Sequence, residues 1–352
     1  MPMTDALGPS GKRLQLVDAH THTSGSEYDG SPEDVVACFD GCGIDKAFMF
    51  APLLRPQGWE LQVEHLDNIR QNNDYIAHFC SQAPERLIAF AVLNPNPGIA
   101  GGDRRMAARL MEEEAERCYH ELGIRGVKMV PDRWTAEDEE MVPLLEGIAG
   151  LGMYVVFHSG IFMDERSSSY CRPALYEGIH RIPGFHGQLA HLGWPWVDEE
   201  LAVLMMESFH RKPDPEDPWQ LKADFSFGAP PDWRVDSLLK ALNSLPPDQL
   251  VYGSDCWWPI KPEEYLRQSL LPHLAAFEAA ADQSRQGGGE GSEQRAQLRT
   301  NVFRENVLTH WDKATRGAPQ ELRRAAIAPQ TSNTRRPRNI PSTHRQRQIH
   351  RS

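Results

Sequence analysis

Two histidines near the start of the chain have the spacing of a metal-binding pair. His20 and His22 directly follow an apolar segment, residues 14–19, and alternate residues of a strand point to the same face. Both imidazoles would therefore project to one side, where they could bind an ion such as Zn²⁺. A His-x-His pair also arises by chance in a chain with 14 histidines, so the pair alone is weak evidence.

Three further polar residues follow apolar segments later in the chain, namely His158, His191 and Asp255. Burying several such groups without partners would cost on the order of several kcal/mol. A divalent metal ion supplies the missing partner, because imidazole and carboxylate are its common ligands. The residue types favour Zn²⁺, with Mn²⁺ or Fe²⁺ as alternatives, and leave open whether one ion or two are bound.

The elements that carry these residues alternate regularly. Apolar segments with strand character are each followed by a segment with helical character, and an N-cap signal, Ser31 before Pro32, opens the first helix. Eight such alternations predict an α/β fold, the (β/α)8 TIM barrel. The predicted strands are residues 14–19, 46–51, 87–93, 124–130, 153–157, 188–192, 222–227 and 249–253.

The barrel also predicts where the polar residues meet. Active sites of this fold lie at the carboxyl ends of the strands, which is where the histidines and Asp255 stand in the sequence. An open doubly wound sheet is the alternative, but the glycine-rich phosphate turn that it commonly carries after its first strand is missing here. We therefore expect a metal site at the carboxyl-terminal mouth of a barrel.

At these residues the sequence resembles the amidohydrolase superfamily, particularly the amidohydrolase-related (type 2) family of metal-dependent TIM-barrel hydrolases. The resemblance covers about residues 14–312, and its motifs are the segments 18–22, 126–131, 156–160, 190–193 and 253–255, with 301–308 as the closing helix. It implies that His20, His22, His158 and Asp255 are metal ligands. It also implies that His191 either binds a second metal or polarises the substrate.

The predicted reaction is hydrolysis. Asp255 would take a proton from a metal-activated water and return it to the leaving group, while His191 helps to polarise the carbonyl. The bond would be an amide, lactone or ester-like bond of a small, carboxylate-bearing substrate. The alternative is a metal-dependent non-oxidative decarboxylase of an aromatic or unsaturated acid. A non-catalytic barrel that acts through its tail is disfavoured by the complete set of candidate ligands.

Lys128, at the end of the fourth predicted strand, is open to three interpretations. The resemblance implies that it could be carbamylated and bridge two metals. A free ammonium could instead bind a substrate carboxylate, or the lysine could pair with a neighbouring acid.

Other residues near the predicted mouth are candidate substrate contacts. Arg133 follows the fourth strand, Arg172 follows the fifth, and Trp257 comes two residues after Asp255. Surface packing would explain Arg133 equally well. The loops 55–60 and 161–171 are candidate lids, and the first of them contributes Arg55 as a weaker contact.

Charge divides the chain into a body and a tail. The net charge is −12, but residues 313–352 hold ten Lys and Arg residues and one acidic residue, so that the rest carries −21. We expect residues 1–12 to be a flexible N-terminus, 13–312 the barrel domain and 313–352 a disordered basic tail. The acidic balance argues against a dedicated nucleic-acid binder, with weak contact through the tail as the exception.

Composition also bears on compartment and assembly. Six cysteines without paired metal-ligand spacing indicate reduced thiols. No secretory signal and no apolar run of the roughly 18 residues that a membrane span requires are present, so we expect a cytoplasmic protein without a membrane partner. The expected partner is a small-molecule substrate, and a homodimer is the common default for assembly.

Overall fold

A sheet of parallel strands forms the centre of the protein. The computed structural model describes residues 15–25, 30–54, 61, 65–210, 220–226, 228–285 and 292–316. Each of the eight predicted strands has a counterpart, and consecutive strands pair in parallel from β1 through to β8. They are β1 (Leu16–His22), β2 (Ile44–Phe50), β3 (Leu87–Val92), β4 (Gly126–Met129), β5 (Tyr154–Phe157), β6 (Gly187–Leu189), β7 (Leu221–Asp224) and β8 (Leu250–Val251).

A short strand that the sequence did not predict closes the sheet. The strand β9 (Cys256–Trp257) follows β8 almost directly and pairs in parallel with β1. The segment that joins β8 to β9 also bonds to β1: Tyr252 O accepts from Ala19 N at 3.1 Å, and Asp255 N donates to His20 O at 2.8 Å. The chain after β8 therefore bonds along β1, which makes the sheet a barrel and confirms the predicted fold.

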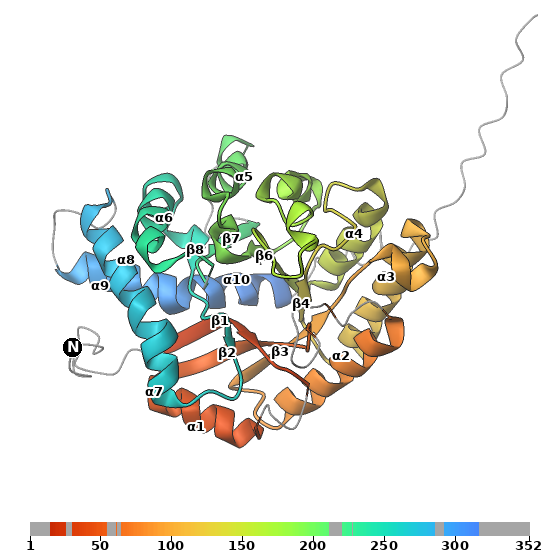
Figure 1. Ribbon diagram of the computed structural model, residues 1–352, viewed down its shortest axis with the longest axis horizontal. Coiled ribbons are helices and arrows are strands. Elements are labelled where there is room, and N and C mark those ends of the chain that lie inside the picture. The colour runs from red at the N-terminus through yellow and green to blue at the C-terminus, as the bar shows by residue number, and fades with distance from the viewer. Residues whose placement is uncertain are drawn as a thin grey trace, which may run out of the picture.

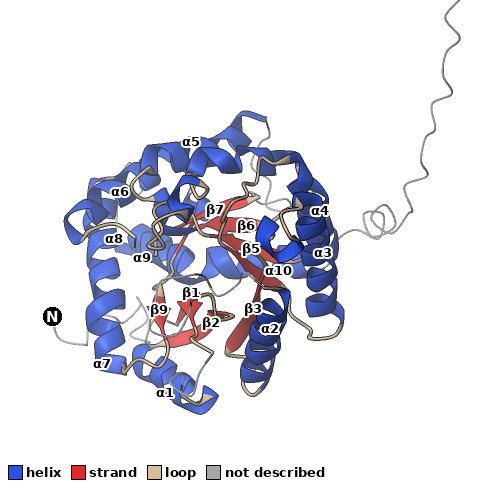
Figure 2. Ribbon diagram, turned by 45° about the vertical axis from the view of Figure 1, so that its right-hand side comes forward, coloured by secondary structure: helices blue, strands red, loops and turns tan. Residues whose placement is uncertain are grey.

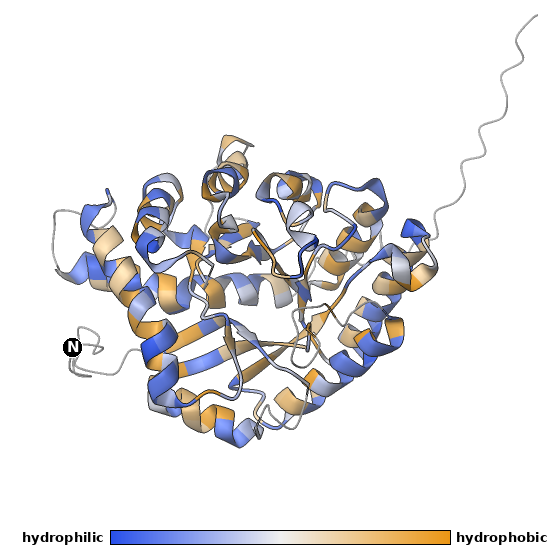
Figure 3. Cartoon of the chain, viewed as in Figure 1, coloured by the Kyte–Doolittle hydropathy of each residue, from blue (hydrophilic) through white to orange (hydrophobic). Residues whose placement is uncertain are grey.

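Helices surround the strands on the outside (Figure 2). They contain both hydrophilic and hydrophobic residues, as expected for helices that cover a sheet on one face and contact solvent on the other (Figure 3). They are α1 (Pro32–Cys42), α2 (Leu66–Ser81), α3 (Arg104–His120), α4 (Val142–Leu151), α5 (Val197–His210), α6 (Pro231–Ser244), α7 (Pro262–Tyr265), α8 (Leu271–Gln283), α9 (Ser292–Thr300) and α10 (Asn306–Thr315). The segment Pro173–Arg181 is a 3₁₀ helix.

The start of α1 shows how local sequence fixes an element. Ser31 Oγ accepts from Asp34 N at 3.2 Å, and the Asp34 carboxylate accepts from Ser31 N at 3.1 Å. This reciprocal capping satisfies two backbone donors, and Pro32 occupies the first helical position. The predicted N-cap is therefore confirmed.

The last helix lies across the amino-terminal side of the strands, a region that we call the floor. In Figure 1, α10 crosses the molecule from the side of α9 towards α4. The Trp311 ring lies 5.2 Å from that of Phe48, 5.5 Å from Phe90 and 6.0 Å from Tyr154, measured between centroids. These contacts fill the floor with aromatic side chains.

The last helix ends slightly beyond the predicted boundary of the barrel domain. Helix α10 ends at Thr315, three residues inside the segment that we predicted as tail, because its buried residue Ala314 still packs against the core. The predicted N-terminus 1–12 and the tail beyond Arg316 lie outside the described residues. Among the described helices, none combines the length and apolar character that crossing a membrane requires.

Candidate metal centre at the barrel mouth

Three predicted ligands converge at the carboxyl ends of the strands, which we call the mouth. His20, His22 and Asp255 each present a ligand atom, and these atoms lie within 4.8 Å of one another. His22 Nε2 is 2.9 Å from Asp255 Oδ1, and the Nε2 atoms of the two histidines are 3.2 Å apart. Two ring nitrogens and a carboxylate oxygen facing one point match the donor set of a divalent transition metal.

The backbone brings these ligands together from β1 and from the turn between β8 and β9. His20 and His22 both lie inside β1, which extends three residues beyond its predicted end. Asp255 has a left-handed backbone, with φ of 58°, in the turn between β8 and β9. A Cβ atom at Gly253 would lie 2.5 Å from Cβ of His20, so only glycine allows this turn to approach β1 so closely.

Asp224 fixes the ring of His20 from behind. At the end of β7, its Oδ2 lies 2.6 Å from His20 Nδ1, so Nδ1–H donates to the carboxylate and Nε2 is left as the ligand atom. Gln188 Nε2 donates to the same oxygen at 3.0 Å. The fit to a cation is therefore good: the tautomer of His20 directs a lone pair towards His22 and Asp255.

Sequence reasoning missed Asp224 and Gln188. Asp224 lies within the seventh predicted strand, and the same signal that selected His158, a polar residue at the end of an apolar segment, could have found it. Gln188 gives no such signal, because it lies inside β6 and points into the barrel, where it is fully buried.

Burial and neighbouring charges shift the pKa values of the three candidate ligands, and not all in the same direction. Burial lowers the pKa of His22 to about 4. For His20, burial and the Lys128 charge oppose protonation, but Asp224 and other carboxylate contacts outweigh them and raise its pKa. Burial also opposes ionisation of Asp255, yet the facing histidines hold its pKa well below the usual range. Asp255 is therefore ionised at neutral pH.

Lys128 lies beside these ligands at the end of β4. Its Nζ is 3.3 Å from His20 Nε2 and 4.8 Å from the centroid of the Phe50 ring. Burial lowers its pKa to about 8. Lys128 therefore lies against the candidate ligands, and its three possible roles stay predictions.

His158 and His191 form a second pair next to the three ligands. His158 Nε2–H donates to the carbonyl of Ile161 at 3.0 Å, which leaves Nδ1 as a lone pair 3.2 Å from His191 Nε2. The His191 ring is 5.0 Å from that of His20, and burial lowers its pKa well below the usual value. His158 thus lies beside the group of converging ligand atoms and not within it, and its predicted ligand role stays a prediction.

The predicted substrate contacts occupy different places. Trp257 stacks on His22, with ring centroids 4.8 Å apart and an angle of 14° between the planes. The exposed Arg133 has a left-handed backbone with φ of 63°. Arg172 is exposed and pairs with Glu199 on the surface. The structure therefore brings Trp257 to the mouth and shows no contact of either arginine with the candidate ligands.

One of the two candidate lids can be traced. Its first residues pack on the centre, because the Phe162 ring lies 4.7 Å from that of His158. Farther along, Arg166 donates to both oxygens of the buried Asp132, at 3.1 and 2.7 Å, which ties this loop to the end of β4. The other candidate lid, 55–60 with Arg55, lies outside the described residues.

Comparisons with known proteins show the family of the chain and agree with its fold. A family model described as amidohydrolase matches residues 17–306. A search among curated proteins returned no match. Solved structures with similar folds include a dihydroxybenzoic acid decarboxylase from Polaromonas sp. JS666 with bound manganese, at 13% identity and TM-score 0.54, over 85% of this chain and 97% of that one.

Two other solved structures are similar to the same extent. One is 5-carboxyvanillate decarboxylase from Sphingomonas paucimobilis, at 14% identity and TM-score 0.52, over 87% of this chain and 100% of that one. The other is a probable 2-pyrone-4,6-dicarboxylic acid hydrolase from Acinetobacter baumannii with citric acid bound, at 14% identity and TM-score 0.53, over 85% and 99%. At such identities the likeness concerns the fold.

Proposed function

The chain belongs to the amidohydrolase family, and from this premise we propose that it is a metal-dependent hydrolase that acts on the carbonyl carbon of a small, carboxylate-bearing substrate. The observation that carries the proposal is the convergence of His20, His22 and Asp255 on one point at the mouth. The proposed metal is Zn²⁺, with Mn²⁺ or Fe²⁺ as alternatives, because two imidazoles and a carboxylate suit all three.

Each residue has a part in the proposed reaction. His20 and His22 would hold the ion together with Asp255, and His158 would join them by turning its Nδ1 lone pair towards the site. When bound, the ion supplies Lewis acidity for the carbonyl and lowers the pKa of a water towards about 7. Asp255 is ionised and faces the same point, so it can take the proton of that water and return it to the leaving group.

Two neighbours would orient the substrate. His191 is held uncharged by burial and lies beside His20, where its ring can polarise the carbonyl. Trp257 covers His22 with the face of its indole and offers an apolar wall. Lys128 would bind a substrate carboxylate as an ammonium, or bridge two ions as a carbamate.

A metal-dependent non-oxidative decarboxylase is the second candidate. It is favoured by the similarity in fold to the enzymes that decarboxylate dihydroxybenzoic acid and 5-carboxyvanillate. In that reaction the same site would bind an aromatic acid, and an acidic group would protonate the ring carbon from which CO₂ departs.

Metal analysis and a substrate screen test these proposals together. Elemental analysis of protein purified without chelator is expected to find Zn, Mn or Fe, and less than about 0.2 equivalents would contradict the metal site. The screen follows lactone, ester and amide cleavage alongside CO₂ release. Release of CO₂ from an aromatic acid without any hydrolysis would replace the hydrolase with the lyase.

The variant Asp255→Asn tests the proton transfer. We expect turnover to fall by about 10²–10⁴-fold, because the general base is lost while the side chain keeps its shape. Asp236→Asn, an exposed aspartate on α6, is the matched control and should leave turnover unchanged. Metal content is measured in both variants. Normal turnover in Asp255→Asn at normal metal content would exclude Asp255 as the base.

A further inference from the structure

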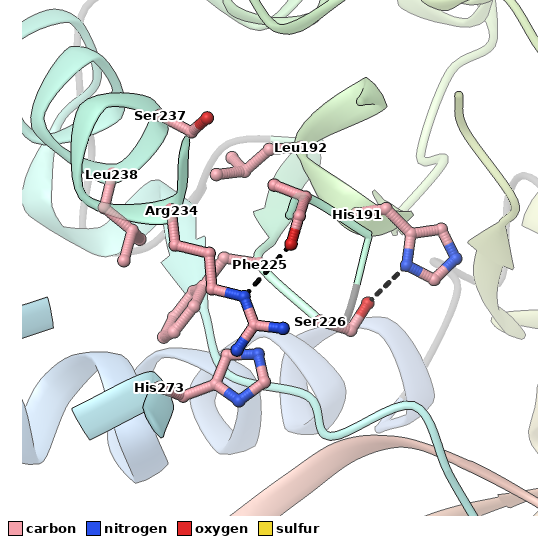
Figure 4. A pocket seen from close by; sticks show the side chains of 9 residues that line it. His191, Leu192, Phe225, Ser226, Arg234, Ser237, Leu238 and His273 are labelled. Atoms are coloured by element: carbon pink, nitrogen blue, oxygen red, sulfur yellow. Dashed lines mark hydrogen bonds between the residues drawn. The ribbon is translucent and has the colours of Figure 1, made fainter. Parts of the chain in front are cut away.

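Two hollows adjoin α6, and they differ greatly in size. The inner one lies beside His191, where Figure 4 shows Arg234 and His273 among the side chains that line it. Its free volume is about 20 Å³, which is room for about one water. The outer one is an open groove between the segment 194–199 and α6, with a free volume of about 610 Å³. Only the outer groove can therefore hold a side chain or a peptide segment.

Aromatic rings and carboxylates line this outer groove, which we call the tryptophan groove. Its tryptophans are Trp194, Trp196 and Trp233, and its lining holds four carboxylates against one lysine. Trp233 is 55% exposed and meets Trp194 edge to face, with ring centroids 6.0 Å apart. The groove begins beside the mouth, because Trp194 N donates to the carbonyl of His191 at 3.1 Å. Exposed indoles edged by carboxylates favour a flat cation, and the guanidinium of arginine is one.

One arginine of the barrel already contacts the wall of the groove in this way. Arg172 Nε donates to both oxygens of Glu199, at 2.9 and 3.0 Å, and its guanidinium carbon lies 5.5 Å from the centroid of the Trp196 ring. Trp196 and Glu199 both line the groove. Asp232 and Trp233, at the start of α6, combine the same two chemistries, and within the described residues no cation pairs with Asp232. The groove therefore offers a second place for a guanidinium.

The chain itself contains a segment with this chemistry. Residues 317–352, which lie outside the described residues, contain eight arginines, no lysine and a single acidic residue. Three of the arginines, Arg335, Arg336 and Arg338, form a cluster that begins 19 residues beyond the last described residue. An extended chain of that length spans roughly 65 Å, whereas a body of about 300 residues has a radius of gyration of about 20 Å. The cluster is therefore long enough to reach the groove.

We propose that the arginine cluster 335–338 docks in the tryptophan groove of the same chain, with a guanidinium on the Trp233 ring and its charge facing Asp232. The segment fits because its charge is opposite to that of the groove and because all its basic side chains are the flat ones that stack on indole. Attachment to the same chain also gives it an effective concentration on the order of millimolar. Docking places the tail at the rim of the mouth, and it does not depend on the proposed reaction.

Limited proteolysis of the full chain with subtilisin, which does not require arginine, tests the docking. The quantity measured is the rate at which residues 335–352 are lost at low salt, followed by mass spectrometry. Asp232→Asn and Trp233→Ala should each raise this rate about fivefold, because cleavage follows the population of undocked tail. Asp67→Asn is the matched control, since Asp67 is also an exposed aspartate in the first turn of its helix, and it should leave the rate unchanged.

A reciprocal variant keeps the test decisive if a groove variant does not fold. Arg335→Gln, Arg336→Gln and Arg338→Gln together change only residues outside the described barrel. At about 0.5 M salt, cleavage of the wild type should accelerate because screening weakens the ion pairs, whereas this triple variant should respond little. Equal rates in the wild type and the folded groove variants would overturn the docking. Protection that fades on dilution would overturn it as well, because the tail would then bind a second copy of the chain.

Discussion

Histidines cluster at both ends of this barrel, but their surroundings differ. At the floor, His186 Nδ1 lies 3.0 Å from His310 Nε2, and the His310 ring packs at 5.0 Å against that of Tyr154. At the mouth, His20 and His22 have a similar ring-nitrogen separation of 3.2 Å. The distance between imidazoles therefore does not distinguish a structural pair from a candidate ligand pair.

Two carboxylates contact the histidine pair at the mouth. At the mouth, Asp224 holds one nitrogen of His20, and Asp255 lies within 3.3 Å of the other. At the floor, the histidine pair meets the aromatic side chains of Tyr154 and the residues packed on α10. The comparison teaches that a histidine pair becomes a candidate metal site when carboxylates set its tautomer and complete its donors.

Hydrogen bonds along the barrel interior connect the two ends. Tyr154 Oη donates to Gln188 Oε1 at 3.0 Å and lies 3.3 Å from His310 Nδ1. The side-chain nitrogen of the same residue, Gln188 Nε2, donates to Asp224 Oδ2. This chain of side chains is one route by which the floor can influence the orientation of His20, and the variants below test how independent the two ends are.

The largest expected effect concerns the stability of the floor. Trp311→Ala removes a ring that packs on Phe48, Phe90 and Tyr154, and it should lower the free energy of unfolding by about 3 kcal/mol, the lower end of the range for buried aromatics, because Trp311 is partly exposed. Urea denaturation measures it. The control Trp233→Ala, at a tryptophan that is 55% exposed, should cost less than about 1 kcal/mol. Metal content should stay normal in folded Trp311→Ala, and its loss there would show that the two ends are not independent.

A smaller effect should appear in metal affinity at the mouth. Asp224→Asn keeps the shape of the side chain but removes the charge that orients His20, so the affinity for Zn²⁺ should fall by about 10–100-fold. Competition with a chelator measures it. Asp45→Asn is the control, since Asp45 pairs with Arg304 at the amino-terminal end of β2 and should leave affinity unchanged. Equal affinities in the two variants would contradict the role assigned to Asp224.

The smallest effect compares two fully buried glutamates. Glu200 lies behind the mouth, where its Oε2 accepts from Ser159 Oγ at 2.7 Å and its Oε1 is buried without a partner in the described structure. Burial raises its pKa well above the usual value. Glu114 on α3 is also buried, but Arg117 and Asn73 outweigh the effect of burial and lower its pKa. The same residue type therefore has opposite linkage to pH at the two positions.

The sign of each stability change follows from these directions. The stabilising contribution of protonated Glu200 is complete below the unfolded pKa of about 4.5 and is lost as pH rises through the folded pKa. Glu200→Gln should therefore gain stability relative to the wild type as pH rises above about 4.5, because the amide cannot ionise. Glu114→Gln should instead lose stability at neutral pH, a loss that shrinks as pH falls. Thermal unfolding across pH measures both, and a parallel response of the two variants would refute the comparison.

Much of the fold follows from local sequence. The eight strands and the capped start of α1 are confirmed, because the apolar alternation and the residues Ser31 and Pro32 act through neighbours in the chain. The short strand β9 escaped prediction because two residues give no periodic signal. It exists because the chain after β8 meets β1, a contact between segments more than 200 residues apart.

The sequence by itself determined the barrel and the residues at its strand ends, including His20, His22 and Asp255, because strand periodicity and position along the chain are local properties. Only the tertiary structure decided which polar residues face one another. The tertiary structure places Asp224 beside His20, although the sequence did not select it. It pairs Arg172, a predicted substrate contact, with Glu199 on the surface, and it places Arg234 at the wall of a cavity beside His191. The physical reason is that hydrogen bonds, burial and charge pairing depend on distances across the barrel, and those distances exist only after the chain has closed on itself.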